Sequence, residues 1–556
     1  MATGMKVRET SWRDAFLWMA GRVLDVMEAA MAWMRRWTSP AEVLGRNLLS
    51  NPYWKPIHEE VHAMQLQVVG EIPACLRGGA YLRNGPNAAH QPVASMHLFD
   101  GDGMVHAVRF HEDGGAAYAN HFVRTERWKV EANAGKALLL KIGDLTGVWG
   151  LFVLAINKAR HKLQIIPKCE RGEDLGTANT SLIWHATRVL ALHEGDVPYA
   201  IRVLCDGALQ TLGALQKAAV EHPLAQDAFM ALPHVCTAHP KRDPRNGELL
   251  TFGYRIKNKP FLEISLVSKE GKTLRSVPVE IQEPVMMHDC AMTDKYFILL
   301  DCPLVFDPKL MVTKGTLPFE MRSRNTRIGL VCREALRNGE EIEIKWMELR
   351  PCFIFHTVNA WDTEDGSVVM FVCRFETFNL GGFKGQLPQL FRFDLDPRTG
   401  SASQKQCLQN DLGLDFPKVH DGLLGLPTQY AYFVRVGKLF ADPGEASSTL
   451  VKVDLQCCQV VGEVGFGPGF MVGEGVFVPC SKPTSEDDGH LLSFITDNEG
   501  KESFLAVVDA HTMSERPIAK VRIPHRVPMG FHGLYITKEE FDLQKNEGGG
   551  STTRIS

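Results

Sequence analysis

Four histidines of the chain lie on or beside short apolar runs of the kind that form β-strands, and histidine side chains can bind metal ions. They are His239, His288, His356 and His532. Their surroundings are Cys236-Thr-Ala-His-Pro-Lys241, Val285-Met-Met-His-Asp289, Phe353-Ile-Phe-His-Thr357 and Arg526-Val-Pro-Met-Gly-Phe-His-Gly533. If all four converge, they make a metal site whose ligands are neutral imidazoles. An ordinary core or surface histidine is the alternative for each, because the chain has 20.

A set of four imidazoles restricts the choice of metal. Imidazole suits iron, copper, zinc or nickel, whereas magnesium and calcium prefer oxygen ligands. Four neutral ligands leave two positions of an octahedral ion open, which suits ferrous iron binding dioxygen, while a structural zinc ion usually takes a closed tetrahedral set. Each ring also needs an acceptor for its other N–H group, and carboxylates could supply it.

The elements that must position these histidines are short strands. Runs rich in Val, Ile, Phe and Tyr, broken by Gly, Pro, Asp and Asn, recur from about residue 55 to residue 540, which predicts many antiparallel strands. No strict repeat is present, so regular propellers of the WD or kelch type are not indicated. A divergent propeller would bring strand ends from distant parts of the chain to one axis.

Residues 12–37 predict an amphipathic helix, with apolar residues at a spacing of three and four. Trp12, Trp18, Trp33 and Trp37 accompany its arginines, as in helices that lie on a membrane surface. Packing on the protein body and a transit sequence are the alternatives. We therefore expect residues 1–54 to form a helix and linker that precede the strand-rich body.

Two helical insertions and a tail are also predicted. Residues 136–162 combine apolar residues with a basic flank, which suits an apolar lip over an entrance near a membrane, with core packing as the alternative. Residues 209–231 indicate a second helical excursion. Residues 541–556 are expected to be a flexible tail because of their Gly- and Ser-rich end.

Composition excludes several classes of protein. With 45% hydrophobic and 23% charged residues and a net charge of −4, the chain is typical of a globular protein and not of one that binds nucleic acid. Its 13 cysteines are scattered, without a CxxC pair, which favours a reduced intracellular compartment, cytoplasm or plastid. Neither a signal-peptide core nor an apolar run of bilayer length is found. No obligate protein partner is inferred.

Considered together, several segments resemble the carotenoid cleavage dioxygenases. The matching segments are Tyr81-Leu-Arg-Asn-Gly-Pro-Asn87, His97-Leu-Phe-Asp-Gly-Asp-Gly-Met104, Asn179-Thr-Ser-Leu-Ile-Trp-His185, Leu190-Ala-Leu-His-Glu-Gly195, Ala238-His-Pro-Lys-Arg-Asp-Pro244, Met287-His-Asp289, Phe355-His-Thr-Val-Asn-Ala360 and Gly530-Phe-His-Gly533. They occur in the order of the family and span roughly residues 55–540. The resemblance implies a seven-bladed β-propeller with one ferrous ion on its axis, capped by helices that form an apolar tunnel.

The resemblance also implies roles for particular residues. It makes His239, His288, His356 and His532 the iron ligands. Carboxylates that hold these ligands match Glu194, Glu474 and Asp415, the last in Asp-Phe-Pro where the family has Glu-Phe-Pro. Because aspartate is one methylene shorter, we expect its bond to a ligand histidine to be longer or bridged by water. Thr180 matches a threonine near an open iron position, and Phe355 matches the tunnel wall.

The activity implied by the resemblance is oxidative cleavage of a conjugated carbon–carbon double bond, with dioxygen as co-substrate and two carbonyl products. A carotenoid or apocarotenoid substrate would be drawn from a bilayer, so peripheral membrane association is expected. Cleavage of stilbene-type aryl alkenes is the alternative within the family. A retinoid isomerohydrolase and a non-catalytic propeller scaffold are the other interpretations, and a scaffold should have lost at least one of the four histidines.

Overall fold

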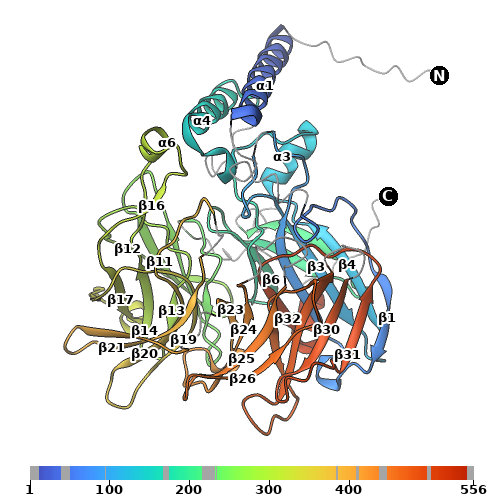
Figure 1. Ribbon diagram of the computed structural model, residues 1–556, viewed down its shortest axis with the longest axis vertical. Coiled ribbons are helices and arrows are strands. Elements are labelled where there is room, and N and C mark those ends of the chain that lie inside the picture. The colour runs from blue at the N-terminus through green and yellow to red at the C-terminus, as the bar shows by residue number, and fades with distance from the viewer. Residues whose placement is uncertain are drawn as a thin grey trace.

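The computed structural model describes residues 12–38, 51–93, 95–166, 175–215, 232, 234–382, 386–408, 412–437, 447–497 and 503–546. Antiparallel strands dominate this part of the chain, which confirms the all-β prediction. Figure 1 shows the sheets in an arc that runs from β12 on the left through β25 to β1 on the right. Helices α1, α3 and α4 lie together at the upper end of the molecule (Figure 1). The fold is therefore propeller-like.

Five sheets have four antiparallel strands each, and within each sheet the strands follow chain order. The first contains β5 (Ser181–His185), β6 (Arg188–Leu192), β7 (Tyr199–Val203) and β8 (Leu209–Ala214). The second contains β9 (Lys241–Arg242), β10 (Leu249–Tyr254), β11 (Leu262–Val267) and β12 (Thr273–Val279). The third contains β13 (Ala291–Met292), β14 (Tyr296–Asp301), β17 (Thr326–Cys332) and β18 (Ile344–Leu349).

The last two of these sheets complete the series. One contains β19 (Phe353–Asp362), β20 (Val368–Phe375), β21 (Gln389–Asp396) and β22 (Ser401–Gln406). The other contains β23 (Leu414–Lys418), β24 (Tyr430–Arg435), β25 (Thr449–Asp454) and β26 (Gln459–Val464). A small ribbon of β15 (Leu304–Phe306) and β16 (Phe319–Met321) accompanies the third sheet.

A ten-stranded sheet joins the two ends of the chain. Its N-terminal strands are β1 (Met64–Gly70), β2 (Ala80–Asn87), β3 (Asp102–Phe110) and β4 (Ala116–Phe122). Its C-terminal strands are β27 (Phe470–Val472), β28 (Val476–Pro479), β29 (Gly489–Asp497), β30 (Ser503–Asp509), β31 (Ala519–Ile523) and β32 (Gly533–Ile536). Strand β1 pairs with both β31 and β4, and β2 pairs with β32. The last strands of the chain thus hold the first ones.

Strand β20 shows why the sequence gives this architecture. Successive side chains of a strand point to opposite faces, and β20 buries both. Its even-numbered apolar residues, including Met370, pack with the third sheet, while Val369, Phe371 and Cys373 pack with the sheet of β23–β26. The outer strand β22 is largely exposed and polar. The buried inner strand therefore has a continuous apolar sequence, and the outer strand has a polar one.

The helices pack at one end of the strand body. Helix α1 (Trp12–Thr38) agrees with its prediction and packs on α4 (Gly147–Lys162). Shorter helices are α3 (Glu126–Ala134), α6 (Leu310–Thr313) and α7 (Arg333–Asn338), with 3-10 turns at η1 (Ala74–Leu76), η2 (Ile142–Asp144) and η4 (Asp421–Leu423). Within the described ranges, no helix is both long and apolar enough to cross a bilayer.

The insertion predicted at 136–162 is helical only in its second half. Gly147 takes a φ of +60°, a left-handed conformation that interrupts a helix. Before it, the Asp100 carboxylate accepts hydrogen bonds from the backbone N–H groups of Ile142 and Gly143, at 2.8 and 3.0 Å. These bonds hold the chain in a tight turn, so the helix begins at Gly147.

Two boundaries of the sequence interpretation were wrong. Residues 209–214, expected to be helical, form strand β8, which pairs with β7; residues 216–231 lie outside the described ranges. The tail expected from residue 541 begins later, because helix α8 (Lys538–Asn546) continues past that position. Its Phe541 is buried under the Arg109 guanidinium, 3.9 Å from the ring centroid. Both segments are ordered by tertiary contacts that local composition does not reveal.

A buried ion pair fixes α1 to α4. Arg160 of α4 is 2% exposed, and its guanidinium lies 2.6 Å from a carboxylate oxygen of Glu28 and 3.0 Å from one of Asp25. Removing one partner of a buried pair leaves an uncompensated charge. Arg160→Met should therefore weaken the docking of α1 by about 3 kcal/mol, measured as faster hydrogen exchange in α1. Lys158→Met, at an exposed position of the same helix, is the control, and equal exchange in both variants would contradict this role.

Candidate metal centre and adjoining cavity

His532 is held by close contact between two segments from opposite ends of the chain. The preceding Phe531 donates its N–H to the Asn84 carbonyl at 2.9 Å, and the His532 carbonyl accepts from the Asn84 N–H at 3.0 Å. A Cβ at Gly530 would lie 2.5 Å from the Arg83 guanidinium carbon, so only glycine fits there. The His532 N–H points to the Thr180 carbonyl, 3.3 Å away. Gly530 thus permits the close approach of its segment to Arg83 and Asn84, and this approach turns the His532 ring inward.

Asp289 fixes the segments that carry the other three histidines. This carboxylate, next to His288, accepts hydrogen bonds from the backbone N–H and the hydroxyl of Thr357 at 2.7 and 2.9 Å. It also lies 2.8 Å from the ammonium of Lys241. Thr357 follows His356, and Lys241 lies two residues after His239. Burial opposes ionisation of Asp289, but Lys241 holds its pKa below the usual value. One buried charge therefore connects three histidine-bearing segments.

The four imidazoles converge. His239 Nε2 lies 3.0 Å from His288 Nε2. The His239 ring centroid lies 4.6 Å from that of His532 and 5.1 Å from that of His356. Candidate ligand atoms of His239, His356 and His532 all lie within 4.8 Å of one another, and His288 joins them through its contact with His239. The structure thus brings together all four histidines that the sequence singled out.

Three of the rings are paired with carboxylates through Nδ1. His288 pairs with Glu194 Oε1 in a short contact, His356 Nδ1 lies 2.6 Å from Asp415 Oδ1, and His532 Nδ1 lies 2.8 Å from Glu474 Oε1. In the described part of the chain, His239 has no such carboxylate partner. With Nδ1 engaged, each paired ring presents Nε2 to the centre. This arrangement orients imidazoles as metal ligands.

The expectation of a longer or water-bridged bond at Asp415 was wrong, because the contact is direct. Strand β23 pairs irregularly with β24 between Asp415 and Lys418, and Phe416 there takes a φ of +53°. The Phe416 N–H also donates to Asp415 Oδ1 at 2.9 Å. This local backbone shape places the shorter side chain within reach of His356.

Electrostatics around His532 favour a neutral ring beside an ionised carboxylate. Burial opposes ionisation of Glu474, but Lys418, 3.4 Å away, and His532 hold the pKa of Glu474 below its usual value. Burial lowers the pKa of His532 to about 4, although Glu474 opposes this shift. Burial and the three neighbouring histidines likewise lower the pKa of His239. Neutral imidazoles are the form that binds a metal ion.

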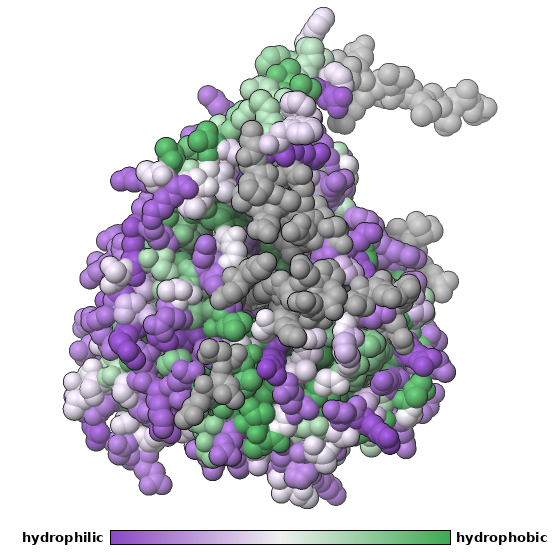
Figure 2. All heavy atoms as spheres, in the orientation of Figure 1, coloured by the Kyte–Doolittle hydropathy of each residue, from purple (hydrophilic) through white to green (hydrophobic). Residues whose placement is uncertain are grey.

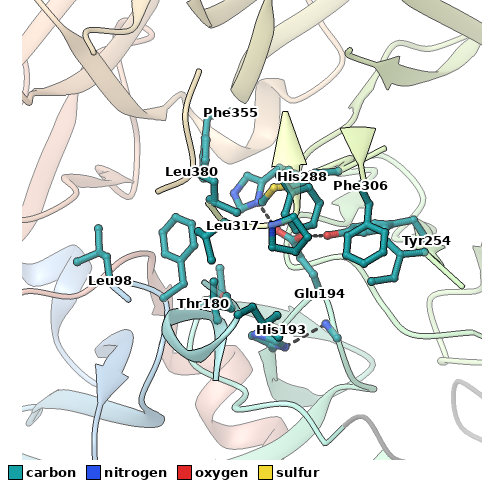
Figure 3. Close-up of a pocket in the computed structure, with 18 of the residues that line it drawn as sticks. Leu98, Thr180, His193, Glu194, Tyr254, His288, Phe306, Leu317, Phe355 and Leu380 are labelled. Atoms are coloured by element: carbon teal, nitrogen blue, oxygen red, sulfur yellow. Dashed lines mark hydrogen bonds and ion pairs between the residues drawn. The ribbon is translucent and has the colours of Figure 1, made fainter. Parts of the chain in front are cut away.

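The other two carboxylates act differently on their rings. Burial opposes ionisation of Glu194, but the His288 ring and the Tyr254 hydroxyl, which donates to Oε2 at 2.6 Å, lower its pKa. Figure 3 shows Tyr254 and His288 both joined to Glu194. At His356, burial lowers the pKa of the imidazole, but Asp415 outweighs it and the net shift is upward.

The donor set fits a metal ion. His356 Nε2 is buried and has no hydrogen-bond partner among the described residues. Buried polar atoms are normally satisfied, so an unpaired ring nitrogen needs an explanation. A cation at the centre of the four rings would supply the missing interaction, and an all-nitrogen set is suited to iron, copper, zinc or nickel.

A cavity of about 700 Å³ adjoins the histidines. His288, His356 and His532 line it, together with Thr180 and Phe355, which Figure 3 shows beside the same space. Much of the remaining wall is apolar, including Leu98, Leu140, Leu145, Met286, Met311, Leu317, Phe319 and Leu380. The cavity can therefore hold an apolar molecule against the histidine cluster.

Aromatic rings cover the centre where it meets the cavity. Phe355 lies against His288, with ring centroids 4.1 Å apart, and Phe99 contacts both Phe355 and Phe531. Phe416 lies 5.6 Å from the His356 centroid. Sequence reasoning singled out only Phe355. Phe416 follows Asp415 and Phe531 precedes His532, and that adjacency was the available signal for these two rings. Phe99 lies in the segment His97–Met104, which the resemblance had matched without assigning it a role.

Two further partners were missed by sequence reasoning. Tyr254 and Lys418 contact Glu194 and Glu474, as described above. Tyr254 lies 60 residues from its partner along the chain. A single sequence gives no sign of such contacts, except that Lys418 shares the Asp-Phe-Pro-Lys segment with Asp415.

Comparison with known proteins identifies the class. The family described as retinal pigment epithelial membrane protein matches residues 54–537. Carotenoid 9,10(9',10')-cleavage dioxygenase 1 of Pisum sativum is 39% identical over 513 residues, 88% of this chain and 90% of that protein. A chloroplastic 9-cis-epoxycarotenoid dioxygenase of Arabidopsis thaliana is 32% identical over 515 residues, 91% of this chain and 83% of that protein.

Solved structures agree in fold. A mutant of Synechocystis apocarotenoid oxygenase has a TM-score of 0.71 at 25% identity, covering 88% of this chain and 98% of that one. Pseudomonas brassicacearum lignostilbene dioxygenase has a TM-score of 0.71 at 24% identity, with the same coverage. The chain belongs to the carotenoid cleavage dioxygenase family. It is accordingly a dioxygenase enzyme.

The Asp415 carboxylate gives a test of the centre. Asp415→Asn keeps the shape of the side chain but removes the charge that supports His356, so Fe²⁺ affinity should fall by about 10- to 100-fold. Anaerobic titration against a competing chelator measures it. Asp394→Asn, on the exposed side of strand β21, is the matched control. Unchanged affinity in a folded Asp415→Asn protein would contradict the role of this carboxylate.

Proposed function

We propose that the enzyme cleaves a conjugated carbon–carbon double bond of a carotenoid or apocarotenoid with dioxygen, giving two carbonyl products. The observation that carries this proposal is the opening of a four-histidine cluster onto a mostly apolar cavity of about 700 Å³. A polyene offers few polar groups, so a mostly apolar cavity suits it. Relatives named as a carotenoid 9,10-cleavage dioxygenase and a 9-cis-epoxycarotenoid dioxygenase support the substrate class.

The metal proposed for the centre is Fe²⁺, one per chain, held by His239, His288, His356 and His532. When bound, ferrous iron supplies the ability to activate dioxygen. A solved structure of the same fold is described as cobalt-substituted Synechocystis apocarotenoid oxygenase, which supports a metal ion in this chain as well. The role we assign to Glu194, Asp415 and Glu474 is to hold Nδ1 of His288, His356 and His532, so that Nε2 of each ring is turned toward the metal.

The cavity wall does the remaining work in this proposal. Phe355 and its aromatic neighbours exclude water from the space beside the histidines and contact the polyene. The depth and shape of the cavity then determine which double bond lies next to the centre. Thr180 lines the same space, and its carbonyl fixes the backbone of His532, so we assign it a place beside the open side of the metal.

We further infer that the ten-stranded sheet is two propeller blades joined at β1. One half contains β2, β3, β4 and β32, and the other contains β27 to β31. Together with the five four-stranded sheets these halves make seven blades. Helices α1, α4 and α6 would then form a cap over the cavity, which residues of α4 and α6 line.

The test is an aerobic incubation of Fe²⁺-loaded enzyme with carotenoids, apocarotenals and hydroxystilbenes, with products separated by liquid chromatography and identified by mass. Aldehyde or ketone fragments of a polyene are expected, and their masses identify the cleaved bond. His356→Ala should lose bound iron and product together, whereas His58→Ala, at an exposed position, should keep both. Benzaldehydes from the stilbenes alone would reject the carotenoid substrate and support the aryl-alkene alternative.

We also propose that the helical end docks on a membrane surface. Most large apolar side chains on one side of α1 are exposed, including Val23 at 58% and Val26 at 66%, and exposed Leu151 and Leu154 of α4 extend the surface. Figure 2 shows green apolar atoms at the upper end of the molecule, where Figure 1 places α1 and α4. Leu154 also lines the cavity, so the apolar surface and the cavity wall meet on α4. A lipid-soluble substrate could then enter without crossing water.

Point changes test this docking better than deletion of α1, because α1 also packs on the body. Val23→Glu and Val26→Glu should each reduce partitioning onto phosphatidylcholine vesicles by about tenfold. In each variant a charge replaces an apolar side chain that would be buried in the membrane surface on docking. Ala29→Glu adds the same charge beside the arginines of α1 and is the control. Equal partitioning of all three variants in a vesicle flotation assay would reject the docking face.

A further inference from the structure

A second cluster of candidate metal ligands lies among residues that take no part in the cavity wall. It comprises Cys75 in η1, Cys480 just after β28, and His490 on β29. One ligand atom from each lies within 4.8 Å of the other two. Cys75 Sγ is 3.5 Å from His490 Nδ1, and the Cys480 thiol lies beside that of Cys75. Three donors from two distant parts of the chain therefore meet at one point.

The backbone of each segment fixes these donors. In the hairpin of β28 and β29, Val478 lies opposite His490, and the Cys480 N–H donates to the Asp488 carbonyl at 3.0 Å. The hairpin therefore delivers Cys480 beside His490. Turn η1 is held by the Tyr535 hydroxyl, which donates to the Leu76 carbonyl at 3.0 Å. The cluster is thus built on hydrogen-bonded backbone.

Asp488 supplies a fourth donor next to the cluster. The Asp488 carboxylate lies beside the Cys480 thiol. The backbone N–H and the hydroxyl of Thr484 donate to Asp488 Oδ2, at 2.9 and 3.0 Å, which leaves Oδ1 without a bond from Thr484. With Oδ2 held by Thr484, Oδ1 is the oxygen that would turn toward an ion bound by the three donors that meet.

We propose that Cys75, Cys480, His490 and Asp488 bind a zinc ion. Two thiolates, one imidazole and one carboxylate are all zinc ligands, and four donors complete its tetrahedral shell. On binding, the two thiol protons pass to solvent and both sulfurs bind as thiolates. His490 is buried, whereas both cysteines are partly exposed, so an ion can enter from the surface.

Zinc at this site would cross-link parts of the sheet that hold the histidine centre. Strand β28 starts two residues after Glu474, and η1 precedes β2, which pairs with β32 directly after His532. A bound ion would therefore pin the segment before β2 to the hairpin that follows Glu474. The site stabilises the folded protein in this proposal and takes no part in the reaction.

Cobalt titration of the reduced, metal-free full-length protein tests the proposal. Thiolate ligands give Co²⁺ a charge-transfer absorption that histidine ligands do not, so the signal separates this site from the four-histidine centre. One thiolate-bound cobalt per chain is expected, displaced by Zn²⁺, and zinc should raise the melting temperature. Cys75→Ser and Cys480→Ser should abolish the absorption, and His490→Gln should weaken zinc binding more than tenfold. Cys205→Ser, at an exposed cysteine elsewhere, should change neither.

Several outcomes would overturn the site. Absence of the absorption in the wild-type protein excludes thiolate ligation, and its persistence in both cysteine variants moves it to other cysteines. A Cys75–Cys480 disulfide in protein purified without oxygen, found by peptide mapping, would make the pair a covalent link instead. Circular dichroism of the metal-free variants checks that they are folded like the wild type, so that a lost signal reports lost binding.

Discussion

The pairing of buried imidazoles with buried carboxylates is the constraint on which the rest of this structure depends. A carboxylate removed from water is costly unless a partner and hydrogen bonds compensate it. Glu474 meets this condition through His532 and Lys418, and Asp289 meets it through Lys241 and Thr357. Each such pair also turns a ring or fixes the segment that carries one. The charges that are hardest to bury are therefore the ones that define the geometry of the centre.

A propeller-like arrangement brings the two partners of each pair together without requiring a special sequence motif around either of them. Each sheet is a simple antiparallel meander, and β20 shows how one strand can serve the cores on both of its faces. Because the sheets surround a common centre, the segments that leave their inner strands converge. Partners 58 to 94 residues apart, such as Glu474 with His532 and Glu194 with His288, can meet there. The strand body thus acts as a rigid frame that brings together polar side chains from distant parts of the sequence.

Much of the fold and the four histidines could be predicted from the sequence, and the reasons differ. Strand β20 can be recognised in the sequence as a continuous apolar run, because both of its faces pack into a core. The four histidines can be recognised because their segments resemble those of a known family. The contact of Asp415 with His356 could not be judged, since it depends on a backbone irregularity at Phe416 rather than on side-chain length. Strand β8 and helix α8 were misjudged because pairing with β7 and burial of Phe541 decide their structure. The contacts of Tyr254 with Glu194 and of Lys418 with Glu474 were seen only in the structure.

The pairing of β1 with β31 and of β2 with β32 has a consequence for the order in which the protein is made. During synthesis β1 and β2 emerge long before residues 519–536, so the edge of β1 that pairs with β31 and the edge of β2 that pairs with β32 have no native partner for most of translation. Unpaired strand edges favour association with other chains. His532 also arrives with these last strands, so ring closure and completion of the histidine cluster are one late event. A nascent chain therefore cannot acquire a complete centre before its fold is closed.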